Sequence, residues 1–156
     1  MATKPEERGT DFESLLSLHR YFLNADYLRD VFEKRLREQN TRHVSGDSRW
    51  IGDHIAMSQW YASVYVVIEG WRECRPGDDR LAVLLKADYM DKLRVFRNQM
   101  FHFQRSYDNR KLLHFLGEAD GDAEAAAGWI RAVHAALGQA IESELQSILD
   151  ARTSGR

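Results

Sequence analysis

The chain has 156 residues, of which 44% are hydrophobic and 29% are charged, which is enough apolar material for one domain with a sizeable core. The formal net charge of −2 and the pI of about 6.3 give no global sign of a nucleic-acid or membrane partner. The one cysteine, Cys74, excludes an internal disulfide and suits a reducing cytoplasm, where we expect the protein to act.

No membrane segment or leader is expected from the residue pattern. Residues 1–10 read as a flexible lead-in, and the start MATKPEERGTDFE lacks the apolar stretch of a signal peptide. The longest uncharged run, residues 55–68, has 14 residues and contains Ser58, Gln59 and Ser63, so it is too short to span a bilayer. We therefore expect a cytoplasmic protein with no membrane partner.

Apolar residues recur at helical spacing through most of the chain. The spacing predicts a helix from residue 11 to about 38, and a second from about 49 to 73 that is apolar almost all round and therefore central. The turn CRPGDD leads to a short helix at 80–86 and a longer one from 88 to about 104. A short apolar segment at 112–116 and the linker GEADGDA precede a last helix at 124–149.

No strand pattern competes with these helices. We predict an all-α fold, an antiparallel bundle of four main helices plus short extra helices. Residues 11–149 form a single domain in this interpretation, and residues 150–156 form a flexible tail.

The modest net charge hides a local asymmetry. Residues 86–111 carry seven basic and three acidic side chains, whereas residues 117–150 carry seven acidic side chains and one basic side chain. An anionic partner, if there is one, is expected to meet the first segment and to avoid the second.

The stretch FRNQMFHFQR, residues 96–105, has an unusual mixture of side chains for an amphipathic helix. At 100° per residue, one stripe of the predicted helix is apolar and faces the core: Tyr89, Leu93, Phe96, Met100 and Phe103. A nearly opposite stripe is polar: Arg94, Asn98, His102 and Arg105. Arg97 lies on the flank of the polar stripe, and Phe101 points the same way as that stripe. An exposed phenylalanine there indicates a surface covered by a partner chain or a ligand.

Two interpretations of this stretch remain open. One is a solvated basic face with a stray phenylalanine, as many charged helix faces are. The other assigns His102 as a proton shuttle, Arg97 as a fixed charge for phosphate, and Asn98 as a group that orients the ring or binds a phosphate oxygen. Arg94 and Arg105 are supporting residues in that interpretation, which needs neither a metal nor a cofactor.

The motif RNQMFH (Arg97, Asn98 and His102) resembles the R-N-x-x-x-H signature of HEPN domains, the higher eukaryote and prokaryote nucleotide-binding family. The resemblance extends to the position of the motif on a helix that follows a long apolar helix. It implies a homodimer in which two motifs face one cleft, with Phe101 at the interface. It also implies a metal-independent endoribonuclease of the toxin or antiviral defence type, with an antitoxin or a defence protein as a partner. One HEPN subgroup has a tyrosine two residues after the histidine, where this chain has Gln104, so neutralisation by modification of that tyrosine is not implied.

The resemblance also implies roles for individual side chains. His102 would act as general acid or base at the ribose 2′-hydroxyl and the scissile phosphate, Arg97 would hold the phosphate, and Asn98 would assist. Some HEPN proteins place an acid on the preceding helix near the motif arginine, so a contact of Glu69 with Arg97 is one expectation. The alternative is that Glu69 points to solvent or pairs with Arg72.

Metal and nucleotide-cofactor sites are not predicted. The six histidines form no metal-binding motif, and no glycine-rich phosphate loop is present, so we expect no metal and no cofactor. Three functions are carried forward: an endoribonuclease, a non-catalytic HEPN-like module that binds nucleotide, RNA or protein, and a structural helical homodimer.

Overall fold

The computed structural model describes residues 12–41, 47–74, 77–85, 88–106, 109–117 and 121–154. These ranges contain six helices and no strand: α1 (Phe12–Thr41), α2 (Asp47–Cys74), α3 (Asp79–Leu84), α4 (Tyr89–Phe101), α5 (Arg110–Leu113) and α6 (Asp122–Ser154). The prediction of an all-α fold is confirmed. The lead-in expected at residues 1–10 lies outside the described residues. Across the described ranges, no helix is both long and apolar enough to cross a bilayer.

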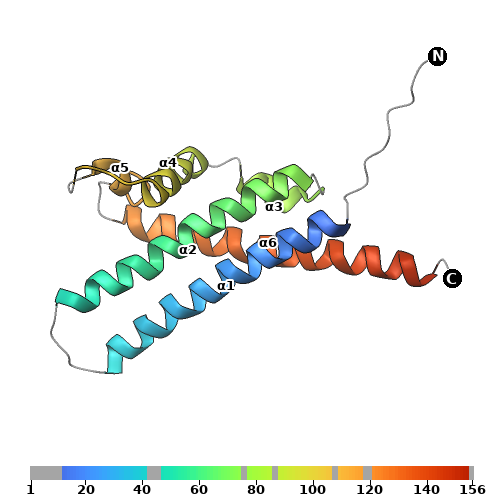
Figure 1. The fold of residues 1–156 in the computed structure, drawn as a ribbon, viewed down its shortest axis with the longest axis horizontal. Helices are drawn as coiled ribbons and strands as arrows, with labels where there is room; N and C mark the ends of the chain where they lie inside the picture. Colours follow the sequence, from blue (N-terminus) through green and yellow to red (C-terminus); the bar gives the residue numbers. More distant parts are fainter. Residues whose placement is uncertain are drawn as a thin grey trace, which may run out of the picture.

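The long helices α1, α2 and α6 form the body of the molecule (Figure 1). α1 and α2 pair as an antiparallel hairpin, and the pairing is tight because Gly70 has no side chain. A Cβ atom at Gly70 would meet Leu18 Cδ1 at 2.8 Å. Gly138 of α6 has the same role against α1, because a Cβ atom there would meet the ring of Phe22 at 2.6 Å. Both glycines therefore permit close helix packing.

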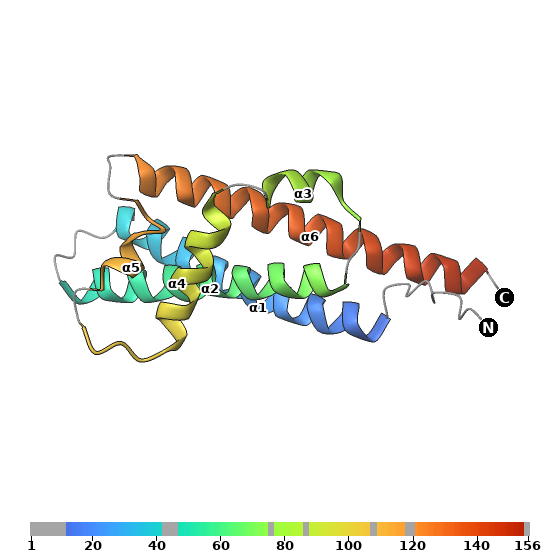
Figure 2. The ribbon, with the colours of Figure 1, turned by 90° about the horizontal axis from the view of Figure 1, so that it is seen from above.

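The helix α2 is central, as its all-round apolar sequence predicts. It contacts α1, α4 and α6, and α4 lies on the side of α2 opposite to α1 (Figure 1). α4 crosses α2 at a steep angle, as Figure 2 shows. Its anchors Leu93 and Phe96 are fully buried, and each contributes roughly 1.5–3 kcal/mol by burial.

An aromatic cluster joins α4 to the rest of the core. The ring of Phe115, which follows α5, lies 5.7 Å from the rings of both Tyr61 and Phe96 and 6.2 Å from that of Trp129. The indole of Trp129 also donates a hydrogen bond to the Leu84 carbonyl at 3.0 Å. These contacts fix α4 and the end of α3 to α6.

A buried histidine on α6 forms a closed polar network with α1 and α2. The Trp60 indole N–H donates to His134 Nδ1 at 3.1 Å, and because indole can only donate, Nδ1 must carry a lone pair. His134 Nε2 then carries the proton and donates to Asp26 Oδ1 at 2.9 Å. Burial lowers the pKa of His134, and the hydrogen bond that Asp26 accepts from it opposes that shift. His134 is therefore a neutral structural residue with both ring nitrogens bonded.

α6 continues beyond the end predicted for it. The helix runs to Ser154, five residues past the predicted end at Leu149, so residues 150–154 are helical where a tail was predicted. The guanidinium of Arg152 lies 4.1 Å from the centroid of the Phe12 ring. This cation–π contact with the start of α1 stabilises the last turn, and no spacing pattern within α6 reveals it.

Candidate functional site

Arg97 and Glu69 meet where α4 crosses α2. Arg97 follows the buried Phe96, so its side chain leaves α4 at the border between core and solvent. Arg97 Nη2 donates to Glu69 Oε2 at 3.0 Å, and the two side chains are 29% and 43% exposed. The expected contact between Glu69 and Arg97 is confirmed, and the alternative pairing of Glu69 with Arg72 is not observed among the described residues.

Two further contacts fix the Arg97 guanidinium. Arg97 Nη1 donates to Asn98 Oδ1 at 2.8 Å, and the guanidinium carbon lies 5.6 Å from the centroid of the Tyr65 ring. A guanidinium has five N–H groups, and Glu69 and Asn98 occupy one each. In the described part of the chain, the remaining N–H groups are free to bind an anion that enters from solvent.

Tyr65 reports the charges that surround this contact. Burial raises the pKa of the Tyr65 hydroxyl and Glu69 raises it further, whereas Arg94, Arg97 and Arg72 act in the opposite direction. Arg97 is in contact with the Tyr65 ring, Arg94 lies one turn before Arg97 on α4, and Arg72 lies one turn after Glu69 on α2. Three arginines therefore flank the contact of α4 with α2.

Arg94 belongs to this group but is held loosely. Its nearest acid is Asp91, at 3.7 Å, and the two side chains are 56% and 92% exposed. An ion pair this long and this exposed contributes little to stability. Arg94 can therefore turn toward an anion near Tyr65 at low cost.

The prediction that this helix continues to about residue 104, with Arg105 on its polar stripe, was wrong at the C-terminal end. α4 stops at Phe101, and His102 has an extended backbone, with φ of −118° and ψ of 132°. The His102 N–H still donates to the Asn98 carbonyl at 3.1 Å, which is the last helical hydrogen bond. His102 and Arg105 therefore do not continue a helical stripe with Arg94 and Asn98. Both side chains are exposed, and the His102 ring makes no hydrogen bond with another described residue.

Side-chain hydrogen bonds explain why the helix ends without glycine or proline. Gln104 Nε2 donates to the His102 carbonyl at 2.9 Å, which competes with continued helix. Asn109 Nδ2 donates to Gln99 Oε1 at 2.5 Å, which draws the start of α5 back against α4. Asn109 also caps α5 through the Lys111 N–H at 3.1 Å. These bonds are made by polar side chains, so the spacing of apolar residues does not predict where the helix ends.

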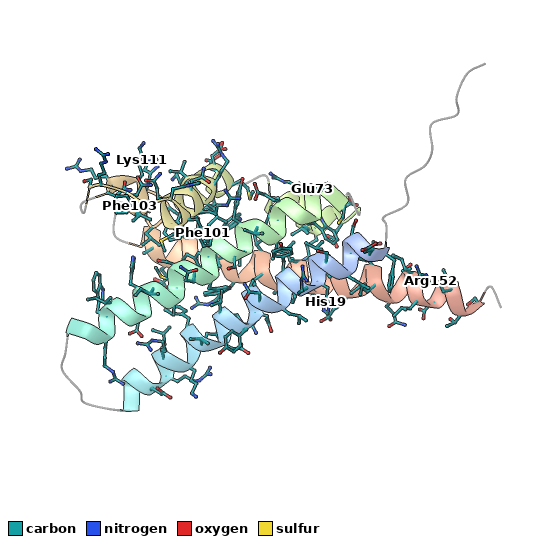
Figure 3. All side chains as sticks on the ribbon, in the orientation of Figure 1. His19, Glu73, Phe101, Phe103, Lys111 and Arg152 are labelled. Carbon is teal, nitrogen blue, oxygen red and sulfur yellow. The ribbon has the colours of Figure 1, made fainter. Side chains whose placement is uncertain are left out.

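The early helix end changes the environment of one phenylalanine. Phe103 was predicted to face the core, but it is 92% exposed because it lies beyond the last turn of α4. Phe101, predicted to be exposed, is 51% exposed. Figure 3 shows Phe101, Phe103 and Lys111 at the same end of the molecule, far from Arg152.

The structure thus divides the predicted site residues into two sets. Arg97, Asn98 and Glu69 are in direct contact, with Arg94 nearby. Phe101, His102 and Arg105 lie at and beyond the end of α4, and no contact links His102 to Arg97. The fold therefore holds Arg97 and Asn98 more firmly than His102.

Sequence reasoning missed Tyr65 and Arg72. Tyr65, Glu69 and Arg72 are spaced by four and three residues on α2, which places them on one helix face toward α4. That spacing is visible in the sequence, but the surrounding apolar run hides it. Only the crossing of α4 over α2 identifies this face as part of the site.

The arrangement suits binding and acid–base chemistry on an anion. The described residues contain no group of three or more His, Cys, Asp and Glu side chains placed to hold a metal ion. The fixed guanidinium of Arg97 offers charge and direction, and the exposed imidazole of His102 offers proton transfer. No family model, no curated protein and no solved structure matches this chain.

Proposed function

We propose that this chain is a HEPN-type, metal-independent endoribonuclease that acts in the cytoplasm, in defence or in toxin-type growth control. The observation that supports the proposal best is the Arg97 guanidinium, which Glu69 and Asn98 hold in place at the contact of α4 with α2. The exposed His102 follows at the end of α4, in the order of the R-N-x-x-x-H motif.

The reaction assigned to this site is transfer of a phosphate ester within RNA. The ribose 2′-oxygen attacks the phosphorus, the bond to the 5′-oxygen breaks, and a 2′,3′-cyclic phosphate and a 5′-hydroxyl form. A base removes the proton of the 2′-hydroxyl, and an acid protonates the departing 5′-oxygen. Arg97 binds the phosphate and stabilises the added negative charge, and Asn98 keeps the guanidinium in place.

A homodimer supplies both the acid and the base. Each chain has one motif histidine, and two copies of His102 that face one cleft provide one group for each proton transfer. Phe101 is a suitable interface residue because it is half exposed at the end of α4. Phe101→Asp is expected to convert the dimer into a monomer in light scattering, and a dimer that survives this change would contradict the interface.

The test of the function is RNA cleavage in EDTA. Purified wild type is incubated with total RNA and with tRNA, beside His102→Ala and the exposed control His114→Ala. Wild type and the control are expected to leave 2′,3′-cyclic phosphate ends, and His102→Ala is expected to cleave at least about a hundredfold more slowly. Equal cleavage by all three proteins, or cleavage that EDTA abolishes, contradicts the proposal.

A non-catalytic binding module is the second candidate, and one observation favours it. No contact links His102 to Arg97, so the guanidinium has no proton-transfer group beside it within the chain. This candidate predicts no cleavage by wild type and an RNA, nucleotide or protein affinity that falls in Arg97→Ala. An antitoxin or a defence protein is the protein partner expected for either candidate.

A further inference from the structure

Phe103 is the most exposed large apolar side chain among the described residues. It is 92% exposed, whereas the phenylalanines at positions 22, 32, 96 and 115 are each 7% exposed or less. Burial of a phenylalanine side chain is favourable, and the folded chain leaves this contribution unused at Phe103. The ring is thus available to a ligand.

The backbone that carries Phe103 is held at both sides. On one side, the His102 N–H is bonded to α4, and Gln104 is bonded to the His102 carbonyl. On the other side, the hydrogen bond from Asn109 to Gln99 closes the connection to α5. A ring on a braced segment loses less conformational freedom when it binds than a ring on a loose one.

The described residues that follow Phe103 in the chain include three cations. Arg105, Arg110 and Lys111 are exposed, and the bond between Asn109 and Gln99 brings the start of α5 against α4. The described residues from Gln99 to Lys111 include no carboxylate, and the one acid of this stretch, Asp108, lies outside the described residues. Figure 3 shows Lys111 and Phe103 in the same region.

We propose that Phe103 is a stacking platform for an unpaired base of the RNA whose phosphates Arg105, Arg110 and Lys111 bind. This inference rests on the proposed function and adds to it a residue that selects single-stranded over paired RNA. An unpaired base has an accessible face for an aromatic ring, whereas a base in a duplex is already stacked on both faces. A flat apolar ring among cations matches a base joined to phosphates.

A second copy of this chain fits the Phe103 surface less well. In a symmetric dimer, a surface that covers itself brings its cations toward the cations of the second copy. Like charges that approach each other without counter-charges oppose association. An RNA strand supplies those counter-charges, and a second Phe103 surface does not.

The experiment uses the full chain carrying His102→Ala, so that the RNA is not cut, in EDTA. The probe is a short single-stranded RNA that contains 2-aminopurine, whose fluorescence is quenched when the base stacks. Phe103→Leu is compared with Phe103→Trp, which keeps an aromatic face. A duplex of the same RNA and an inorganic polyphosphate are the matched ligands without an accessible base.

The expected result is quenching that Phe103→Leu abolishes and Phe103→Trp retains. Phe103→Leu is also expected to weaken binding of the single strand by about tenfold, while binding of the duplex and of polyphosphate is unchanged. Light scattering is expected to give the same oligomeric state for all variants. Unchanged single-strand affinity in Phe103→Leu, or no binding of single-stranded RNA at all, overturns the inference.

Two results separate this inference from the proposed function. Quenching that depends on Phe103, without cleavage by wild type, supports the stacking platform and contradicts the ribonuclease. Cleavage by wild type that Phe103→Leu leaves unchanged supports the ribonuclease and overturns the platform. If Phe103→Leu converts the dimer into a monomer, the Phe103 ring packs against a second copy of the chain, and the inference is likewise overturned.

Discussion

Two polar clusters of the described residues differ in how completely their hydrogen bonds are used. One is centred on His134 in the core, and the other consists of Glu69, Arg97 and Asn98 with His102 at the end of α4. In the core, His134 is 1% exposed, and its two ring nitrogens are bonded to Trp60 and Asp26. At the end of α4, the His102 ring is exposed and has no hydrogen bond with another described residue. Arg97 likewise keeps N–H groups that no described residue accepts.

This difference separates a group that stabilises the fold from a group that is open to a ligand. Removal of one partner from a saturated buried network leaves the others unpaired in the core, which is costly. Removal of an exposed, unbonded ring leaves nothing unpaired. Stability measurements can therefore test whether the two histidines have the roles that their surroundings assign.

The largest expected effect is the loss of His134. His134→Ala leaves the buried Trp60 N–H without a partner, removes the His134 bond to Asp26, which keeps only its ion pair with Arg29, and opens a cavity. We therefore expect the free energy of unfolding to fall by about 3 kcal/mol. His102→Ala is expected to change it by no more than about 0.5 kcal/mol. Urea unfolding followed by circular dichroism measures both.

His114 is an exposed histidine outside both clusters, and His114→Ala is therefore the control for the loss of an imidazole. If His102→Ala destabilises the protein as strongly as His134→Ala, the comparison between a closed and an open cluster is wrong. His102 would then support the fold through contacts that the static structure lacks.

The second prediction concerns pH. Burial is the main reason why the pKa of His134 is lowered in the folded protein. Below the ordinary histidine pKa of 6.5, the unfolded chain therefore binds more protons than the folded chain. Stability due to His134 is therefore complete above pH 6.5 and is lost as the pH falls, by at most about 1.4 kcal/mol per pH unit. Protonation of Nδ1 would also set two donors, the new N–H and that of Trp60, against each other.

Urea unfolding between pH 7.5 and 5 tests this prediction. The charged groups that act on His134 are Asp26, Asp30 and Arg29, and the two carboxylates favour its protonated form. His134→Leu is expected to flatten the dependence on pH, and His114→Leu is expected to leave it as in wild type. A wild-type stability that is constant over this range would contradict the neutral form assigned to His134.

The sequence was a good guide to features that depend on local periodicity. The helical runs, the central position of α2 and the buried Phe96 all follow from apolar spacing. A carboxylate at the edge of an apolar helix needs a cation, and the resemblance to HEPN domains made Arg97 one of the partners expected for Glu69. Each of these features is determined within one helix or by one pair of opposite charges.

Features that depend on contacts between distant segments were missed. The end of α4 is set by Gln104 and by the bond from Asn109 to Gln99, so the helical wheel placed Phe103 in the core when it is exposed. The network of His134 joins three helices through Asp26 and Trp60, and no spacing in the sequence relates these residues. Hydrogen bonds between polar side chains of distant segments leave no periodic pattern in the sequence.

The smallest expected effect is the coupling between Glu69 and Arg97. Both side chains are partly exposed, so solvent screens their attraction, and a double-mutant cycle with Glu69→Gln and Arg97→Gln is expected to give about 0.5–1 kcal/mol. The longer and more exposed pair of Asp91 and Arg94 is the control, and no measurable coupling is expected there.

The same variants sharpen the distinction between a structural and a functional arginine. In the His102→Ala background, Glu69→Gln removes the charge that competes with phosphate for Arg97, so the RNA affinity should rise a few-fold, whereas Arg97→Gln should lower it. Fluorescence anisotropy at two salt concentrations measures both changes, because phosphate contacts weaken as salt rises. Two results together would contradict this role of Arg97: a coupling of several kcal/mol, and an RNA affinity that Glu69→Gln leaves unchanged. Arg97 would then be a structural residue like His134, and no anion-binding group would remain in the cluster at the end of α4.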